Sequence, residues 1–188
     1  MNIIPMTITD VIRLEPRRFA DDRGWFMESW RENSFQDAVG QPIKFVQDNH
    51  SFSAHANTVR GLHYQAPPFA QGKLVRCTRG SIIDVAVDFR PKSKTFGHWV
   101  SAKLSADNGH MLWVPEGFLH GFSTLEYNCD VQYKCTNYYN ANADANIAWN
   151  DPKLSIDWGL AQGFDPSKAV LSDKDMAAPA FSDIISPF

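Results

Sequence analysis

Apolar and polar residues alternate with a period of two along much of the chain between about residues 43 and 136. In SIIDVAVDFR (81–90), large apolar side chains alternate with Asp84, Ala86 and Asp88. The same alternation recurs in HWVSAKLSA (98–106) and in NCDVQYKC (128–135). Because a period of two places successive side chains on opposite faces of an extended chain, the pattern predicts a series of short β-strands.

Turn-forming residues separate these runs and limit the length of each strand. They cluster in RGS (79–81), RPKSK (90–94), ADNG (106–109) and PEG (115–117). Many short strands at regular spacing are typical of an all-β sandwich or barrel.

Only two stretches have the features of helices. ENSFQDAVG (32–40) ends on glycine, which commonly terminates a helix, and a second helix is expected to begin near SDKDMAA (172–178) with Ser172 as its N-cap. No repeat, low-complexity tract or Pro- and Ser-rich linker divides the chain. We therefore expect one domain over residues 1–188, a mainly β barrel with a few short helices.

The composition is that of an ordinary globular protein with a sizeable core: of 188 residues, 44% are hydrophobic and 21% are charged. The net charge of −3 argues against a nucleic-acid partner, which requires clustered positive charge. We expect no membrane partner either, because no apolar run approaches the length of a membrane span and the first residues lack a signal-peptide pattern. Cys77, Cys129 and Cys135 have neither C-x-x-C nor zinc-site spacing, so we expect reduced, buried thiols in a cytoplasmic protein.

Several motifs of cofactor-dependent enzymes are absent. The chain has no G-x-G-x-x-G that opens a helix, no phosphate-binding loop and no G-x-S-x-G. Its six histidines form neither an H-x-H nor an H-E-x-x-H pair. If the protein is an enzyme, we expect it to act without a metal or a redox cofactor.

One segment has the form of a cupin motif. WVPEGFLHGF (113–122) resembles the second cupin motif, P-x-G-x-x-H, and GLHYQ (61–65) stands where the first motif is expected. The first motif of metal-binding cupins supplies two histidines and a glutamate, whereas GLHYQ has one histidine. Because a transition-metal site usually needs three or more ligands, the resemblance favours a cupin barrel without a metal and disfavours a metal-dependent dioxygenase.

Nine blocks along the chain extend this resemblance to one family. They are DDRGWFMESW, FVQDNHS, RGLHYQ, QGKLVRC, DVAVDFR, WVPEGFLHGF, YKCTNYY, IAWNDP and LSDKD. In this order they resemble the dTDP-4-dehydrorhamnose 3,5-epimerases over nearly the whole chain. The resemblance implies a cupin-type double-stranded β-helix, or jelly-roll barrel. It also implies cofactor-free inversion of C3 and C5 of dTDP-4-dehydro-6-deoxy-D-glucose to give dTDP-4-dehydro-L-rhamnose.

Four residues match the family's catalytic groups. His63 matches the base, and histidine suits this role because its ordinary pKa lies near the working pH. Asp175 matches the carboxylate that orients the imidazole. Lys73 matches the cation that stabilises the enolate oxygen, and Tyr133 matches the general acid on the opposite face of the sugar.

The resemblance also implies a substrate-binding set. Asp84 and His120 match polar residues that line the family's pocket, and one of Trp25 and Phe26 is expected to sandwich the thymine with one of Tyr138 and Tyr139. Asp144 stands where the family often has glutamate. The segment DRGWFMES is expected to reach the site of a neighbouring subunit, which implies a homodimer. The remaining positions match residues that hold the diphosphate and the deoxyribose–thymine portion: Arg23, Glu28, Gln47, Asp48, Asn49, Arg60 and Lys174.

Other interpretations of the same residues remain open. Tyr133 shares a strand face with Val131 and Cys135, which is also the pattern of simple core packing, and Asp175 could act only as a helix capping residue. An epimerase that inverts C3 or C5 alone would share His63 and Tyr133. A 3,4-ketoisomerase and a non-catalytic cupin that binds a nucleotide sugar are further alternatives.

Overall fold

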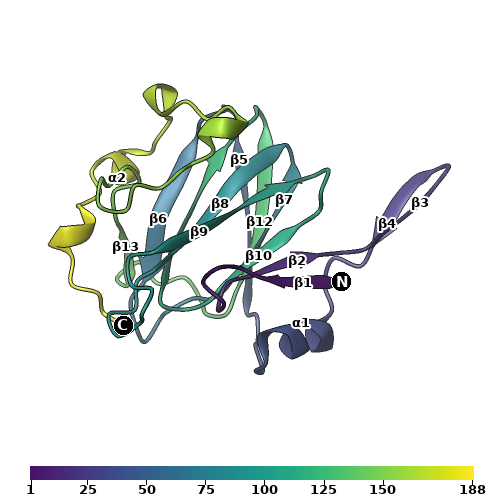
Figure 1. Ribbon diagram of the computed structural model, residues 1–188, viewed down its shortest axis with the longest axis horizontal. Coiled ribbons are helices and arrows are strands. Elements are labelled where there is room, and N and C mark those ends of the chain that lie inside the picture. The colour runs from purple at the N-terminus through teal and green to yellow at the C-terminus, as the bar shows by residue number, and fades with distance from the viewer.

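The computed structural model describes residues 1–188 as two antiparallel sheets that face each other, with few and short helices (Figure 1). This is the mainly β architecture that the alternation predicts. The six-stranded sheet has the order β1 (Asn2–Pro5), β2 (Ile12–Glu15), β10 (Met111–Val114), β7 (Lys73–Arg79), β12 (Cys129–Cys135) and β5 (Gln47–Ser53). The five-stranded sheet has the order β13 (Asp144–Asn146), β6 (Val59–Gln65), β11 (Phe118–Thr124), β8 (Ser81–Asp88) and β9 (Trp99–Ser105).

The main core fills the space between the two sheets. Val75 and Val131 of the larger sheet pack there with Ile82, Ala86 and Phe122 of the smaller sheet. Because both sheets bury these faces, closing the sandwich removes a large apolar area from water, which is the main stabilising contribution to such a fold.

The outer face of the five-stranded sheet is also covered, and this explains why all eight residues of β8 are buried. Val85 and Val87 pack against Trp149, Trp158 and Phe164 of the C-terminal segment. That segment contains the short 3₁₀ helices η1 (Leu160–Gln162), η2 (Pro166–Lys168) and η3 (Phe181–Asp183), which the sequence did not predict.

Both predicted helices are present. Helix α1 (Glu32–Val39) covers part of the outer face of the six-stranded sheet and ends at Gly40, whose φ of 76° requires the left-handed conformation that glycine adopts most easily. Helix α2 (Asp173–Met176) begins at Ser172, whose side chain accepts a hydrogen bond from the Asp175 backbone N–H. Neither helix is long and apolar enough to cross a membrane.

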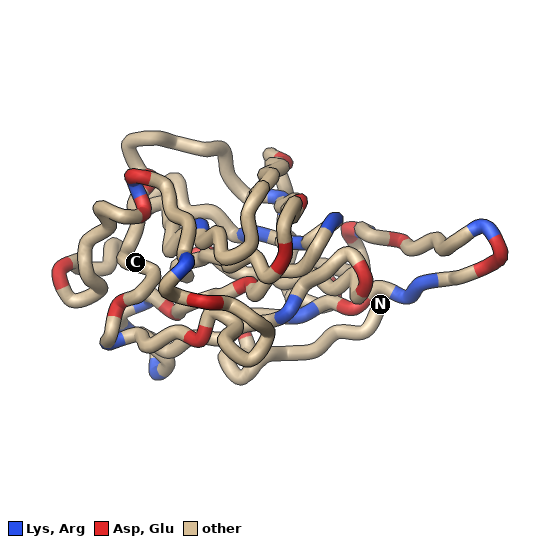
Figure 2. The backbone as a smooth tube through the Cα atoms, turned by 90° about the horizontal axis from the view of Figure 1, so that it is seen from above, with Lys and Arg blue, Asp and Glu red and all other residues tan.

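A hairpin of β3 (Arg18–Asp21) and β4 (Gly24–Met27) projects from the body of the molecule (Figures 1 and 2). Charged residues of both signs lie at its tip (Figure 2). At its base, the Arg18 guanidinium donates hydrogen bonds to the carbonyl groups of Ala106 and Asp107 and stacks on the Trp25 ring at 4.1 Å. The base of the hairpin is therefore fixed to the barrel, whereas its tip extends away from the barrel.

The three cysteines are buried and free, as the sequence analysis expects.

Candidate active site

A cleft of about 380 Å³ lies between the two sheets, a size suited to a small-molecule ligand. A second lobe of about 340 Å³ adjoins it and shares His63, Lys73, Tyr133 and Lys174 with it. All four predicted catalytic residues, His63, Lys73, Tyr133 and Asp175, therefore line the cleft.

The position of His63 depends on a close approach between β6 and β11. A Cβ atom at Gly61 would lie 2.6 Å from the Cα atom of Gly121, so only glycine allows the two strands to come this close. In the resulting register His63 pairs with His120, and the register of the two strands shifts between His120 and Phe122. Two imidazoles thus reach the cleft from neighbouring strands.

His63 forms a short hydrogen bond with Asp175, although 112 positions separate them in the sequence. The distance from His63 Nε2 to Asp175 Oδ1 is 2.6 Å, and the Ser172 hydroxyl donates to Asp175 Oδ2 at 3.0 Å. A proton on Nε2 leaves Nδ1 of the neutral ring as the basic nitrogen. The N-cap residue of α2 therefore orients the carboxylate, and the carboxylate orients the His63 imidazole.

The environment favours the ionised form of Asp175. Burial alone would raise the pKa of this carboxyl group, but its interaction with His63 and the hydrogen bonds from Ser172 and the backbone of Gly61 lower it below its usual range. Asp175 thus supplies a fixed negative charge that stabilises an imidazolium at His63.

Lys73 and Tyr133 occupy the other wall of the cleft, on neighbouring strands of the six-stranded sheet. The Lys73 Nζ atom lies 5.9 Å from the centre of the Tyr133 ring. Burial lowers the pKa of Lys73 and raises that of Tyr133, whose phenol is therefore protonated at neutral pH. One wall consequently offers a cation and a proton donor to a ligand whose other side faces His63.

His120 and Asp84 form a second pair in the same wall as His63. His120 Nε2 donates to Asp84 Oδ1 at 2.8 Å, and Asp84 is 0% exposed. Burial lowers the pKa of His120 more than the neighbouring carboxylate raises it, so its imidazole is neutral near pH 7. Asp84 lies behind His120 and contributes no surface of its own to the cleft.

The second lobe contains several of the predicted nucleotide-binding residues, namely Gln47, Asn49, Tyr139, Asp144 and Lys174. Gln47 Oε1 accepts the backbone N–H of Tyr139 at 2.9 Å. Asp144 Oδ2 accepts both the Tyr139 hydroxyl at 3.2 Å and the Lys174 ammonium. These contacts place an aromatic ring, a cation and amide groups around one space.

Arg60 lines the first lobe beside His63. Its guanidinium donates to Ser53 Oγ at 3.1 Å and to the carbonyl oxygen of Phe52 at 2.9 Å. These bonds to β5 hold its side chain at the edge of the cleft.

The remaining predicted residues lie away from this cleft in their own chain. Arg23, Trp25 and Phe26 are on the projecting hairpin, and Glu28 follows it and pairs with Arg31 at 2.5 Å. The hairpin has two different faces, because Trp25 stacks on Arg18 whereas Phe26, on the other face and opposite Phe19, is 69% exposed. Tyr138 is 65% exposed and lines neither lobe, and Asp48 pairs with Lys134.

The structure adds residues that sequence reasoning missed. Ser51, Val59, Phe122 and Leu171 also line the first lobe, and each lies close in sequence to a recognised block. Alternation along β5 was the available signal for Ser51, since it shares a face with Gln47 and Asn49.

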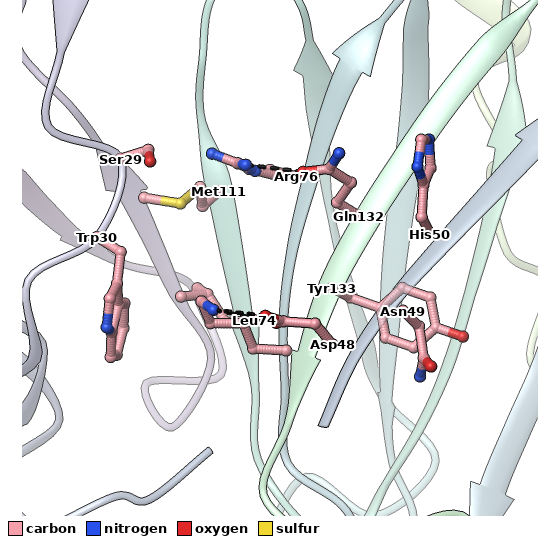
Figure 3. A pocket seen from close by; sticks show the side chains of 11 residues that line it. Ser29, Trp30, Asp48, Asn49, His50, Leu74, Arg76, Met111, Gln132 and Tyr133 are labelled. Carbon is pink, nitrogen blue, oxygen red and sulfur yellow. Dashed lines mark hydrogen bonds and ion pairs between the residues drawn. The ribbon is translucent and has the colours of Figure 1, made fainter. Parts of the chain in front are cut away.

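A further groove of about 400 Å³ runs over the outer face of the six-stranded sheet and shares Asn49, His50 and Tyr133 with the second lobe (Figure 3). Trp30 borders it on one side and His50 on the other, with Arg76 bonded to Gln132 at 2.7 Å between them (Figure 3). Asp48 lies in this groove, and none of the four predicted catalytic residues except Tyr133 lines it.

The residues of the cleft do not form a metal-binding group: no cluster of three or more His, Cys, Asp or Glu side chains in the structure has the geometry to hold a metal ion.

Comparison with known proteins agrees with this geometry. The profile of the dTDP-4-dehydrorhamnose 3,5-epimerase family matches residues 5–183. The chain belongs to this family. A dTDP-4-dehydrorhamnose 3,5-epimerase from Escherichia coli K12 is 51% identical over 175 residues, which cover 93% of this chain and 91% of the relative.

Solved structures of related epimerases have the same fold. The 3,5-epimerase from Legionella pneumophila, in complex with dTDP-4-keto-L-rhamnose, is 42% identical, with a TM-score of 0.91 over 97% of this chain and 94% of that chain. A 3'-monoepimerase from Streptomyces bikiniensis, in complex with dTDP-quinovose, is 31% identical, with a TM-score of 0.87 over 95% of this chain and 87% of that chain.

Proposed function

We propose that this member of the epimerase family inverts C3 and C5 of dTDP-4-dehydro-6-deoxy-D-glucose to give dTDP-4-dehydro-L-rhamnose, without a cofactor. The observation that carries the proposal is the arrangement across one cleft: the His63–Asp175 pair lies on one wall, and Lys73 and Tyr133 lie on the other. An inversion needs a base and an acid on opposite faces of the same carbon, and His63 and Tyr133 are candidates for these roles on opposite walls.

Each of the four catalytic residues has its own role in the proposed reaction. His63 removes the proton from a carbon next to the C4 ketone, and Asp175 stabilises the imidazolium that forms. The electron pair moves to the C4 oxygen, where the Lys73 ammonium stabilises the enolate. Tyr133 then donates its phenolic proton to the opposite face of the carbon, and the two side chains return to their starting protonation states by exchange with solvent. The same cycle at the second carbon completes the conversion.

The second lobe is suited to the nucleotide. Lys174, Arg60 and the amides of Gln47 and Asn49 can bind the diphosphate and deoxyribose. We assign thymine stacking to Tyr139 rather than Tyr138, since only Tyr139 lines the lobe. On the hairpin we assign it to Phe26 rather than Trp25, whose ring is already stacked on Arg18.

We further propose that the enzyme is a homodimer in which each hairpin serves the partner's cleft. Phe26 is 69% exposed on a hairpin that projects from the molecule (Figure 1), and the Tyr139 ring is 58% exposed and stacks on no other ring of its own chain. The tip residue Arg23 is likewise unbound except to neighbouring Asp21. We also infer that the enzyme is one domain over residues 1–188 and is cytoplasmic, a location that the three buried free thiols support.

Mixing two inactive variants tests the exchange of hairpins. In a dimer of Phe26→Ala and His63→Ala chains, one of the two sites would combine an intact hairpin with an intact base. Random exchange makes half of the dimers mixed, so activity should return to about one quarter of wild type. Mixed samples no more active than the separate variants would place the hairpin at its own chain's site or exclude it from catalysis.

An epimerase of a single carbon is the second candidate, because the fold is shared with a named 3'-monoepimerase. Conversion of the substrate, with the product trapped by a 4-ketoreductase, tests the leading proposal. We expect His63→Ala to lose nearly all turnover and to retain dTDP binding, and His98→Ala to behave as wild type. Turnover by His63→Ala within a few-fold of wild type would refute the role of His63.

A further inference from the structure

Asp84 has a feature that substrate binding does not explain. Three buried side-chain nitrogen or oxygen atoms in the protein lack a hydrogen-bond partner, and Asp84 Oδ2 is the only carboxylate oxygen among them. The other oxygen accepts from His120, which is neutral and therefore does not balance the carboxylate charge. A fully buried carboxylate normally requires a positive partner.

Lys73, conversely, is a cation without an anionic partner. Its ammonium makes no ion pair and lies 5.9 Å from the centre of the Tyr133 ring. The other carboxylates near the cleft are already engaged, Asp175 by His63 and Ser172, and Asp144 by Lys174 and Tyr139.

We propose that Asp84 is a positioning residue for catalysis, whose free oxygen balances the charge of Lys73 and keeps its ammonium protonated and directed at the enolate oxygen. This inference rests on the proposed function, since it concerns how the enolate-stabilising cation is maintained. Asp84, Lys73 and neutral His120 then form one unit with no net charge, held between the two sheets.

The charges around Lys73 are consistent with this role. Burial lowers the pKa of Lys73, whereas the Cys135 thiol, the Asp144 carboxylate and the Asp84 carboxylate, in decreasing order, raise it, and Lys174 lowers it. His63, His120 and Tyr133 also line the same lobe. Of the two carboxylates that raise the pKa, Asp84 is the fully buried one, and its Oδ2 atom has no hydrogen-bond partner.

The pH dependence of turnover tests the proposal. Asp84→Asn keeps the shape of the side chain and removes its charge, so Lys73 should lose its proton at lower pH. We expect the alkaline limb of kcat to move down by at least one pH unit and kcat at pH 8 to fall at least tenfold, with dTDP affinity unchanged within twofold. Asp84→Glu should return the alkaline limb of kcat most of the way to its wild-type pH. Asp88→Asn is the matched control, because Asp88 is also fully buried on β8 but pairs with Arg90 away from the cleft.

An unmoved alkaline limb in active Asp84→Asn enzyme would overturn the proposal, as would a loss confined to KM and dTDP affinity. Failure of the wild-type enzyme to bind dTDP or turn over would instead refute the proposed function. If Asp84→Asn does not fold, Lys73→Met provides a second test, since it should leave an unpaired buried carboxylate. Its stability should then rise, relative to wild type, as pH falls from 8 to 5. An identical pH dependence in the two proteins would also overturn the proposal.

Discussion

Replacing Asp175 by asparagine is the sharpest test of the catalytic geometry. The carboxylate is 4% exposed and accepts a hydrogen bond from His63 at 2.6 Å. Asparagine has nearly the same shape, but it carries no charge and its amide can donate as well as accept. The substitution therefore removes the electrostatic partner of His63 with little change in packing.

The expected loss can be worked out from this contact. A hydrogen bond to a charged group contributes roughly 1.5–3 kcal/mol. If it strengthens as His63 becomes an imidazolium, its loss lowers kcat by roughly 10- to 150-fold. An amide that donates to Nε2 also stabilises the tautomer protonated on Nδ1, and the same change in a Ser-His-Asp triad costs about 10⁴. We therefore expect kcat of Asp175→Asn to fall by about 10² to 10⁴.

Initial rates with the trapped product, measured together with dTDP affinity, give the answer. The affinity should stay within a few-fold of wild type, because Asp175 acts through His63. Asp173→Asn is the matched control: it lies in the same helix and is exposed to solvent. Turnover of Asp175→Asn within threefold of wild type, or a loss seen only in KM, would refute the reasoning.

Four further outcomes follow from the structure. Tyr133→Phe should keep deuterium exchange measurable by NMR but lower product formation about 10²- to 10⁴-fold, and equal loss of both would contradict the separate roles. Leu62→Ala, at a fully buried position next to the base, should lower the free energy of unfolding in urea by about 2–5 kcal/mol. Gly121→Ala would place a Cβ 2.8 Å from a carbonyl oxygen of β6, so kcat should fall in protein that remains folded. Burial raises the pKa of Asp88, but hydrogen bonds led by that from Arg90 lower it to about 2, below the ordinary 3.8. Its stabilising effect is thus present above about pH 4 and lost toward pH 2, so Asp88→Asn should cost roughly 2 kcal/mol at pH 7 and flatten the acid decline in stability.

The sequence predicts the parts of the fold that local rules govern. Alternation identifies β8, β9 and β12, and glycine and serine mark the end of α1 and the start of α2. The family resemblance of the sequence also predicts that His63, Lys73 and Tyr133 share one site, although nothing in their spacing shows which strands are neighbours.

Other features depend on tertiary contacts and leave no periodic pattern. The C-terminal segment covers a sheet face with Trp149, Trp158 and Phe164, yet these side chains follow no regular spacing because the segment has almost no regular structure. The choice between Trp25 and Phe26 depends on which hairpin face docks on the barrel. The hairpin strands β3 and β4 were not predicted because each has only four residues.

The role of Asp84 also lies outside sequence reasoning. Its position on the polar side of an alternating strand indicates an exposed or pocket-lining residue, whereas the closed sandwich buries it completely behind His120. Burial on both faces of β8 is a property of the assembled sheets and not of the strand.

Isotope uptake tests the central claim most directly. The enzyme is incubated with dTDP-4-dehydro-6-deoxy-D-glucose in D₂O, without added metal or nicotinamide cofactor, and deuterium is measured at C3 and C5 by NMR. The proposed 3,5-epimerase reaction predicts deuterium at both carbons of the product. Uptake at one carbon alone would indicate a single-carbon epimerase, and no uptake by protein that still binds dTDP would contradict catalysis by His63.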